Sequence, residues 1–230
     1  MNWRTFLRVA SLGGGTLLMS GALSQAVEKH EQGRAEEEVS PAEDLMREHG
    51  VLKRLLLVYQ EAGRRIEARE DLPPEPLADV AKTIRDFIEN YHEKLEENYL
   101  FPRFHKAGKH IALVNVLLQQ HQARRRLTDL TIQFSTAQVL QNPDDRKRLA
   151  RALREFTRMY EPHEAREDTV LFPSFRTIVT SNEYDALGED FEKKEHELFG
   201  EDGFGKTVDR VAGIEKTLGI YELAQFTPKV

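Results

Sequence analysis

Two stretches of the sequence contain histidine and glutamate at a spacing suited to metal binding. They begin at His92 and His163, and both follow the pattern H-E-x-x-E-x-x-x-L-F-P-x-F. A histidine and a glutamate four residues apart lie on one face of a helix, with Cβ atoms about 5–6 Å apart. The spacing therefore predicts two helices that each present an imidazole and a carboxylate to one metal centre: His92 with Glu96, and His163 with Glu167.

A solitary histidine precedes each stretch at nearly the same distance. His49 lies 43 residues before His92, and His121 lies 42 residues before His163. Such self-similarity indicates an internal repeat, whose unit is a hairpin of two helices.

The four histidines and two glutamates occupy positions within apolar stripes that an ordinary helical bundle gives to Leu or Ile. Burying an unpaired carboxylate costs several kcal/mol, and a shared cation removes that cost. A single histidine in such a stripe is more often a core or surface residue, but four with two matching glutamates favour a metal site. Imidazole and carboxylate without thiolate suit iron, with manganese and zinc as alternatives. The chain has no Cys, which excludes disulfides and thiolate chemistry.

Four long segments with helical periodicity position these residues. The first runs from about 42 to 69, the second follows Pro76, the third follows Gly108, and the fourth begins at the predicted cap Asn142. We find no alternating pattern typical of strands. The sequence therefore predicts an all-α protein, an up-down-up-down antiparallel four-helix bundle with additional C-terminal helices. The run Arg124–Arg126 is expected to form a solvated helix face.

The N-terminus has the pattern of an export signal. Residues 1–26 contain Arg4 and Arg8, an uncharged apolar run, and a small-x-small cleavage pattern that ends at Ala26. The segment also resembles a twin-arginine signal with Trp3 in place of the first Arg, so Sec and Tat-like routes both remain open. We expect export, to a periplasm, with no stable membrane span after processing. An uncleaved signal that anchors the protein is the alternative.

The rest of the chain divides into three parts. Residues 27–41 are expected to be a charged linker, 42–200 the bundle with the helix that follows it, and 201–230 a C-terminal helix and a tail that packs on the bundle. The formal net charge of −6 argues against nucleic acid as a partner.

One histidine per helix, with H-x-x-x-E on the second and fourth helices followed by Leu-Phe-Pro, resembles the hemerythrin-like (HHE cation-binding) family over about 42–200. The resemblance implies a non-haem di-iron centre with an oxo or hydroxo bridge. One iron would be held by His49 and His92, the other by His121 and His163, with Glu96 and Glu167 bridging. A ferritin-like site is a weaker match, because Tyr160 stands where its second Glu-x-x-His motif needs Glu.

The sequence departs from the oxygen-carrying members of that family. They have a second histidine on the third helix, where this chain has Arg125. Asp168, five residues after His163, is an alternative to Glu167, and His196 is a candidate fifth imidazole. Glu93, next to His92, is a possible extra ligand by resemblance, although adjacent residues of a helix point about 100° apart.

This ligand set leaves open positions on both irons. We therefore expect a di-iron protein that binds O2 or nitric oxide, or that has a role in iron or redox sensing or in protection. The alternatives are a di-iron enzyme that reduces peroxide or activates oxygen, and a helical interaction module whose metal is structural.

Overall fold

The computed structural model describes residues 39–229 of the 230-residue chain. The predicted export signal at 1–26 and most of the predicted linker lie outside the described residues. Within 39–229 the protein is helical and has no β-strand, which confirms the all-α prediction. None of the helices in this range is long and apolar enough to cross a membrane.

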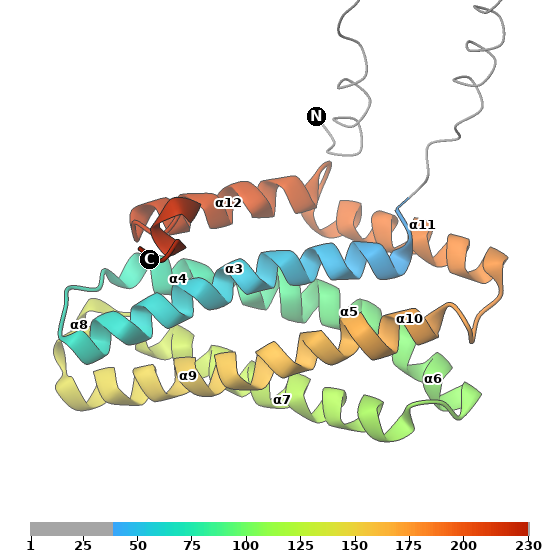
Figure 1. The fold of residues 1–230 in the computed structure, drawn as a ribbon, viewed down its shortest axis with the longest axis horizontal. Helices are drawn as coiled ribbons and strands as arrows, with labels where there is room; N and C mark the ends of the chain where they lie inside the picture. The colour runs from blue at the N-terminus through green and yellow to red at the C-terminus, as the bar shows by residue number, and fades with distance from the viewer. Residues whose placement is uncertain (1–38, 230) are drawn as a thin grey trace, which may run out of the picture.

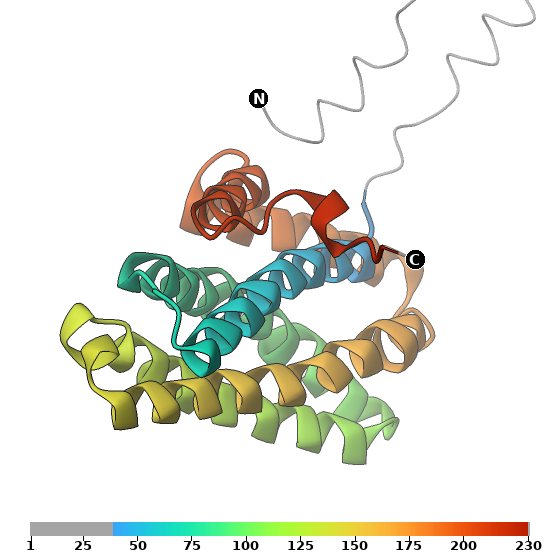
Figure 2. The ribbon, with the colours of Figure 1, turned by 60° about the vertical axis from the view of Figure 1, so that its left-hand side comes forward.

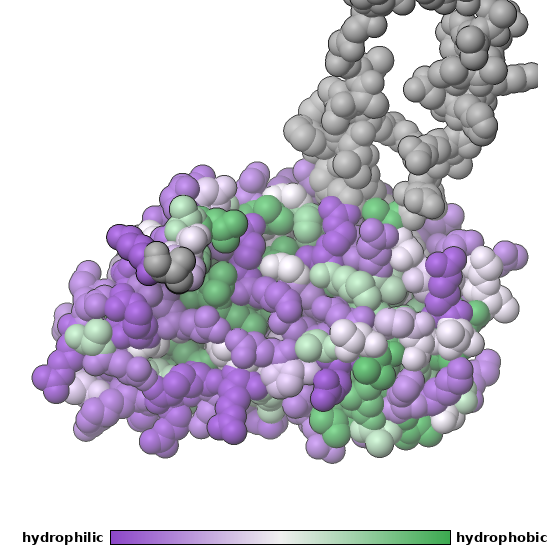
Figure 3. All heavy atoms as spheres, in the orientation of Figure 1, coloured by the Kyte–Doolittle hydropathy of each residue, from purple (hydrophilic) through white to green (hydrophobic). Residues whose placement is uncertain are grey.

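Four long helical segments form the bundle (Figure 1). In chain order they are α3 (Pro41–Ala68); the continuous series α4 (Pro74–Thr83), η1 (Ile84–His92), α5 (Glu93–Leu95), η2 (Glu96–Leu100) and α6 (Phe101–Ala107); α7 (Ile111–Phe134); and α9 (Pro143–Arg166) with η3 (Glu167–Leu171) and α10 (Phe172–Phe175). Successive segments run in opposite directions, and the contacts α3–α4, α4–α7, α7–α9 and α9–α3 close a ring around one core. The surface of the face seen in Figure 3 is mainly hydrophilic.

The ends of the helices are set by local capping. The Ser40 hydroxyl accepts a hydrogen bond from the Glu43 backbone N–H at 3.3 Å, and Pro41 occupies the first helical position. The Asn142 side chain accepts from the N–H groups of residues 144 and 145 at 2.9 and 3.2 Å. Gly108, at φ 67°, ends α6 in the left-handed conformation that favours glycine. These caps lie where the sequence predicted helix boundaries.

Three of the segments are π-helical, and two of them are related by the repeat. The segments η2 and η3 begin at Glu96 and Glu167, and each is followed by a helix with a proline in its first turn, Pro102 or Pro173. A proline donates no hydrogen bond and clashes with the carbonyl four residues earlier, so it disturbs the hydrogen bonds of a regular α-helix. The wider π turn absorbs this conflict, and single-turn π segments are frequent at functional sites.

Two further helices, α11 (Ser181–Phe199) and α12 (Gly203–Thr217), lie across the bundle on the side of α3 (Figures 1 and 2), and a short helix, α8 (Ala137–Gln141), precedes α9. Phe191 and Val211 are fully buried beneath them. The Arg54 guanidinium in α3 binds the Glu215 carboxylate in α12 through two contacts of 3.0 and 2.5 Å. These contacts join α12 to the bundle.

The tail that follows α12 differs from the prediction. Leu218 is buried, but beyond it Leu223 in η4 (Leu223–Phe226) is 82% exposed and Phe226 is 51% exposed. Ile220 is partly buried against the core. The tail therefore packs on the bundle as far as Ile220, and the prediction does not hold for the exposed residues that follow.

Candidate metal centre

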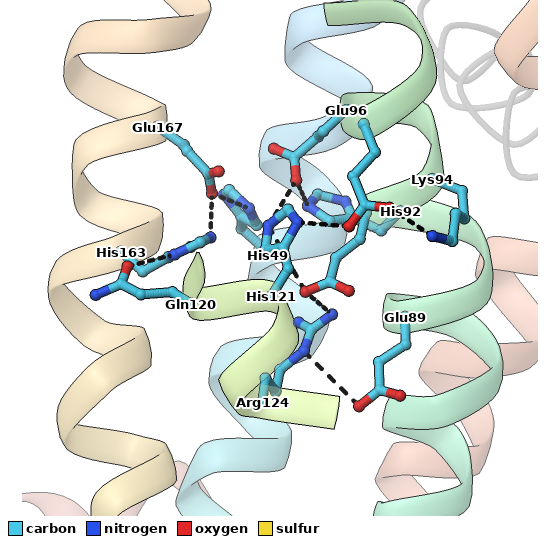
Figure 4. Close-up of polar contacts among 12 residues, drawn as sticks. His49, Glu89, His92, Lys94, Glu96, Gln120, His121, Arg124, His163 and Glu167 are labelled. Atoms are coloured by element: carbon cyan, nitrogen blue, oxygen red, sulfur yellow. Dashed lines mark hydrogen bonds and ion pairs between the residues drawn. The ribbon is translucent and has the colours of Figure 1, made fainter. Parts of the chain in front are cut away.

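All six predicted ligands lie together in the bundle interior (Figure 4). Each is at most 2% exposed, and each of the four helical segments contributes: His49 from α3; His92 and Glu96 from η1 and η2; His121 from α7; His163 and Glu167 from α9 and η3. The repeat explains this convergence, because the two glutamates begin equivalent π segments in facing positions of the bundle.

The histidines form two pairs. We call His49 and His92 pair A, with ring centroids 4.7 Å apart, and His121 and His163 pair B, with centroids 5.1 Å apart. One ligand atom of Glu96 lies within 4.8 Å of those of pair A, and Glu167 has the same relation to pair B. Each pair with its glutamate is therefore compact enough to surround one ion.

The two carboxylates connect the pairs. Oε2 of Glu96 lies 3.7 Å from Nε2 of His92 and 3.4 Å from Nε2 of His121. Oε2 of Glu167 makes the matching contacts with the other histidine of each pair, at 3.4 Å in pair A and 3.1 Å in pair B. Each carboxylate thus contacts one imidazole of each pair, which is the placement that a bridging ligand requires.

The outer nitrogen of every imidazole has its own hydrogen-bond acceptor. The Nδ1 partners are Asp168 for His49 (2.7 Å), Glu48 for His92 (2.7 Å), Glu97 for His121 (3.1 Å) and the Gln120 carbonyl for His163 (2.8 Å). An acceptor at Nδ1 places the ring proton there and leaves the lone pair on Nε2. All four lone pairs are therefore directed inward, as in metal-binding histidines whose outer N–H is hydrogen-bonded.

The inward atoms lack hydrogen bonds. No hydrogen-bond partner within 39–229 satisfies the Nε2 atoms of the four histidines or the carboxylate oxygens of Glu96 and Glu167, although all are buried. Buried polar groups are nearly always satisfied, so a cluster of inward lone pairs and carboxylate oxygens requires protons or cations among them. A site for cations that prefer nitrogen and oxygen ligands fits these residues.

The electrostatics of the ion-free cluster lead to the same conclusion. Burial and the neighbouring Glu167 carboxylate raise the pKa of Glu96 well above its usual range. Burial opposes ionisation of Glu167 too, but His163 and His49 hold its pKa well below the usual range. Burial lowers the pKa of His121 to about 4. Without an ion the centre must share protons among buried groups, and cations that bind there displace them.

Arg124 corrects the prediction of a solvated arginine face. It is fully buried, and its guanidinium contacts the Glu93 carboxylate and the Tyr160 hydroxyl, with Cζ 4.7 Å from the centroid of the Tyr160 ring. Its Nε lies 3.9 Å from Oε1 of the buried Glu89. Arg124 follows His121 by three residues, so both side chains lie on the inward face of α7. Only the last arginine of the run is exposed.

Glu93 also lies at the centre. Its Oε1 is 3.6 Å from Nε2 of His121, and its Oε2 accepts a hydrogen bond from Arg125 at 2.7 Å. The residue is fully buried. It follows a π-helical segment that ends at His92, so the side-chain directions here differ from those of a regular α-helix.

Two candidate ligands lie elsewhere. Asp168, whose side chain is 26% exposed, is on the outer side of His49, where it accepts the Nδ1 hydrogen, so it positions an imidazole while Glu167 faces both pairs. His196 is exposed on α11, which lies outside the four-helix ring and directs Phe191 and Glu195 inward. The prediction of His196 as a fifth imidazole is therefore wrong.

Sequence reasoning missed three of the imidazole partners, although the repeat contained a signal for them. Glu48 and Gln120 directly precede the solitary histidine of their repeat unit. Glu97 and Asp168 each lie five residues after the second histidine of theirs. Comparing the two units beyond the shared motif would have identified these positions.

Comparisons with known proteins agree with this geometry. The family model of the hemerythrin HHE cation binding domain matches residues 40–138 and 112–226. Uncharacterized proteins from Mycobacterium tuberculosis and Mycobacterium bovis are each 50% identical to this chain over 190 residues, which is 83% of this chain and 74% of the relative. No solved structure matches the chain. The chain is therefore a metal-binding member of the hemerythrin HHE cation-binding family.

Proposed function

We propose that the protein holds two non-haem iron ions and binds a small diatomic ligand, O2 or nitric oxide, or uses the ions in sensing or protection. Pair A would hold one ion and pair B the other, with Glu96 and Glu167 as bridges. The observation that carries this proposal is that each carboxylate contacts one imidazole of each pair, at 3.1–3.7 Å. Imidazole with carboxylate suits iron, with manganese and zinc as alternatives.

Room for an exogenous ligand follows from the same residues. Four imidazoles and two bridging carboxylates do not fill the coordination shells of two octahedral ions, even with a solvent-derived bridge. The third helix places Arg125 four residues after His121, where the oxygen carriers have another histidine. The protein therefore leaves more positions open than a five-histidine carrier.

The test begins with the metal content of protein purified from its native compartment, where we expect two irons per chain. Reduced, iron-loaded protein should then show reversible optical changes on addition of O2 or nitric oxide, and a His121→Ala variant should lose them. The absence of any spectral response to either gas would overturn the proposal.

Buried hydrogen-bond donors beside pair B favour peroxide reduction as a second candidate. Arg124 contacts the Tyr160 hydroxyl, and the Tyr160 ring stacks on His163 with centroids 4.6 Å apart. Such donors stabilise negative charge that develops on a bound oxygen species. Steady peroxide consumption that His121→Ala abolishes and His196→Ala preserves would select this function. One zinc per chain would instead indicate a helical interaction module with a structural metal.

The place of action is part of the proposal. The predicted signal at 1–26 would deliver the protein to a periplasm, with cleavage after Ala26. N-terminal sequencing of the mature protein tests this expectation, and an intact Met1 in the exported fraction would indicate a retained anchor.

A further inference from the structure

The hydrogen-bond partners of the imidazoles follow an approximate twofold relation set by the sequence repeat. Glu48 accepts the Nδ1 hydrogen of His92 at 2.7 Å, and Gln120 accepts that of His163 at 2.8 Å. Each acceptor directly precedes the solitary histidine of its own repeat unit and supports the second histidine of that unit. The two halves of the centre are thus built from equivalent positions.

The relation extends to the charged residues around the centre. Four residues after each solitary histidine stands a cation, Lys53 or Arg125, and one residue after each second histidine stands a glutamate. Lys53 binds Glu164 at 3.1 Å, and Arg125 binds Glu93 at 2.7 Å. These matched ion pairs give the two halves similar surroundings.

Three equivalent positions beside the centre differ in charge. The carboxylate of Glu48 at pair A corresponds to the neutral amide of Gln120 at pair B. The buried apolar Leu52 corresponds to the buried Arg124, since both lie three residues after the solitary histidine. The first difference removes a negative charge from the side of pair B. The second adds the positive charge of Arg124, but the buried Glu89, which corresponds to the neutral Tyr160, lies 3.9 Å from it and offsets that charge.

The other two Nδ1 acceptors, Asp168 and Glu97, also leave more negative charge beside pair A than beside pair B. Asp168 at pair A is bound to His49 at 2.7 Å. Glu97, its equivalent at pair B, is also bound by Lys94 and by Arg125, the latter at 2.7 Å. Two cations therefore neutralise the acceptor of His121, while Glu93 near the same imidazole is held by Arg124 and Arg125.

From these differences we infer that the centre is electrically polarised, so that the ion at pair B is the more readily reduced and the ion at pair A keeps the higher charge. A carboxylate acceptor makes an imidazole a stronger donor to its ion than an amide acceptor does. The inference rests on the two-iron centre proposed above.

Variants that make the two halves alike test this inference. Gln120→Glu gives pair B a carboxylate, and Glu48→Gln gives pair A an amide. Gln119→Glu is the matched control, because it adds the same charge at the adjacent but exposed position of α7. Diferric protein is titrated with dithionite in two one-electron steps, each converting one ferric ion to ferrous, and the potentials are read from optical and electron paramagnetic resonance spectra.

We expect Gln120→Glu to lower the potential of the first step, and Glu48→Gln to raise that of the second. Partners of metal-binding histidines typically change metal affinity by about 10–100-fold. A tenfold change in the ferric-to-ferrous balance corresponds to about 59 mV for one electron. Both variants therefore reduce the difference between the two reduction potentials, Gln120→Glu through the first and Glu48→Gln through the second. Gln119→Glu should leave both potentials at their wild-type values.

Iron content and thermal melting are measured first for every variant. Fewer than two irons in the wild-type chain would overturn the proposed function together with this inference. If two irons are bound but the first reduction potential shifts equally in Gln120→Glu and Gln119→Glu, the inference alone is overturned. If Gln120→Glu does not fold with two irons, Glu48→Gln decides: a shift of the second step supports polarisation, and no shift, or a shift of the first step, refutes it.

Discussion

Removal of the metal ions should destabilise the protein strongly. The centre contains four imidazoles and two carboxylates whose inward atoms have no hydrogen-bond partner among the described residues. A buried group left unsatisfied costs about 1–3 kcal/mol, so the six groups together would cost about 6–18 kcal/mol without ions or protons. That range is comparable to the whole stability of a typical domain, about 5–15 kcal/mol.

Protons offset part of this cost in the ion-free protein. Burial and Glu167 raise the pKa of Glu96. Burial opposes the charged form of His49, but the Asp168 carboxylate, which accepts its Nδ1 hydrogen, and the nearby Glu167 carboxylate raise its pKa to about 9. Both shifts favour the protonated form of the group. An ion at about 1,000 times its dissociation constant stabilises the native state by about 4 kcal/mol. Loss of the two proposed ions therefore costs about 8 kcal/mol, which corresponds to a fall in Tm of about 16–32 °C for a domain of this size.

Calorimetry on native, chelated and iron-reloaded protein measures the effect. Elemental analysis must show that the chelated sample is free of metal, and reloading must restore Tm. His121→Ala serves as a control, because a chain that lacks one ligand of pair B should lose less Tm on chelation. A metal-free protein that melts within about 2 °C of the loaded one would refute the argument that these buried groups need cations.

Three further predictions concern single residues. Arg124→Leu removes the fully buried cation that Glu93 and Glu89 share and leaves them only the partly exposed Arg125 and Arg85, so it should cost about 3–5 kcal/mol in urea unfolding. Arg126→Leu on the exposed side should be nearly neutral. Asn142→Ala removes the cap of α9 and should cost about 0.5–2 kcal/mol, and a thermal melt unchanged from wild type would contradict the capping role. His196→Ala should keep the full metal content by elemental analysis while His163→Ala loses metal, and equal losses in both would reinstate His196 as a ligand.

The fold and the six central residues could be predicted from sequence because helical spacing determines them. His92 and Glu96 lie on one face of any helix that contains them, and the repeat doubles that information. The caps at Ser40 and Asn142 are local as well. What the spacing could not give is the π-helical geometry that begins at Glu96 and at its equivalent, because the period of an ordinary α-helix was assumed throughout.

The predictions that failed or were not made have one physical reason. They depend on contacts between helices, which the spacing along one helix does not determine. Arg124 was assigned to a solvated run by its charge, although its phase relative to His121 places it inside. Gln120 accepts a hydrogen bond from the outer nitrogen of His163, which belongs to another helix. His196 failed as a ligand because its position depends on how α11 lies across α3.

The two-part construction of the bundle has a consequence for how such a centre can be made. A homodimer of identical helical hairpins would present the same side chain at both equivalent places, so any negative or positive group added on one side would be duplicated on the other. Joining the hairpins in a single chain removes that constraint. Glu48 and Gln120 can then differ, and one polypeptide can give its two histidine pairs unequal surroundings.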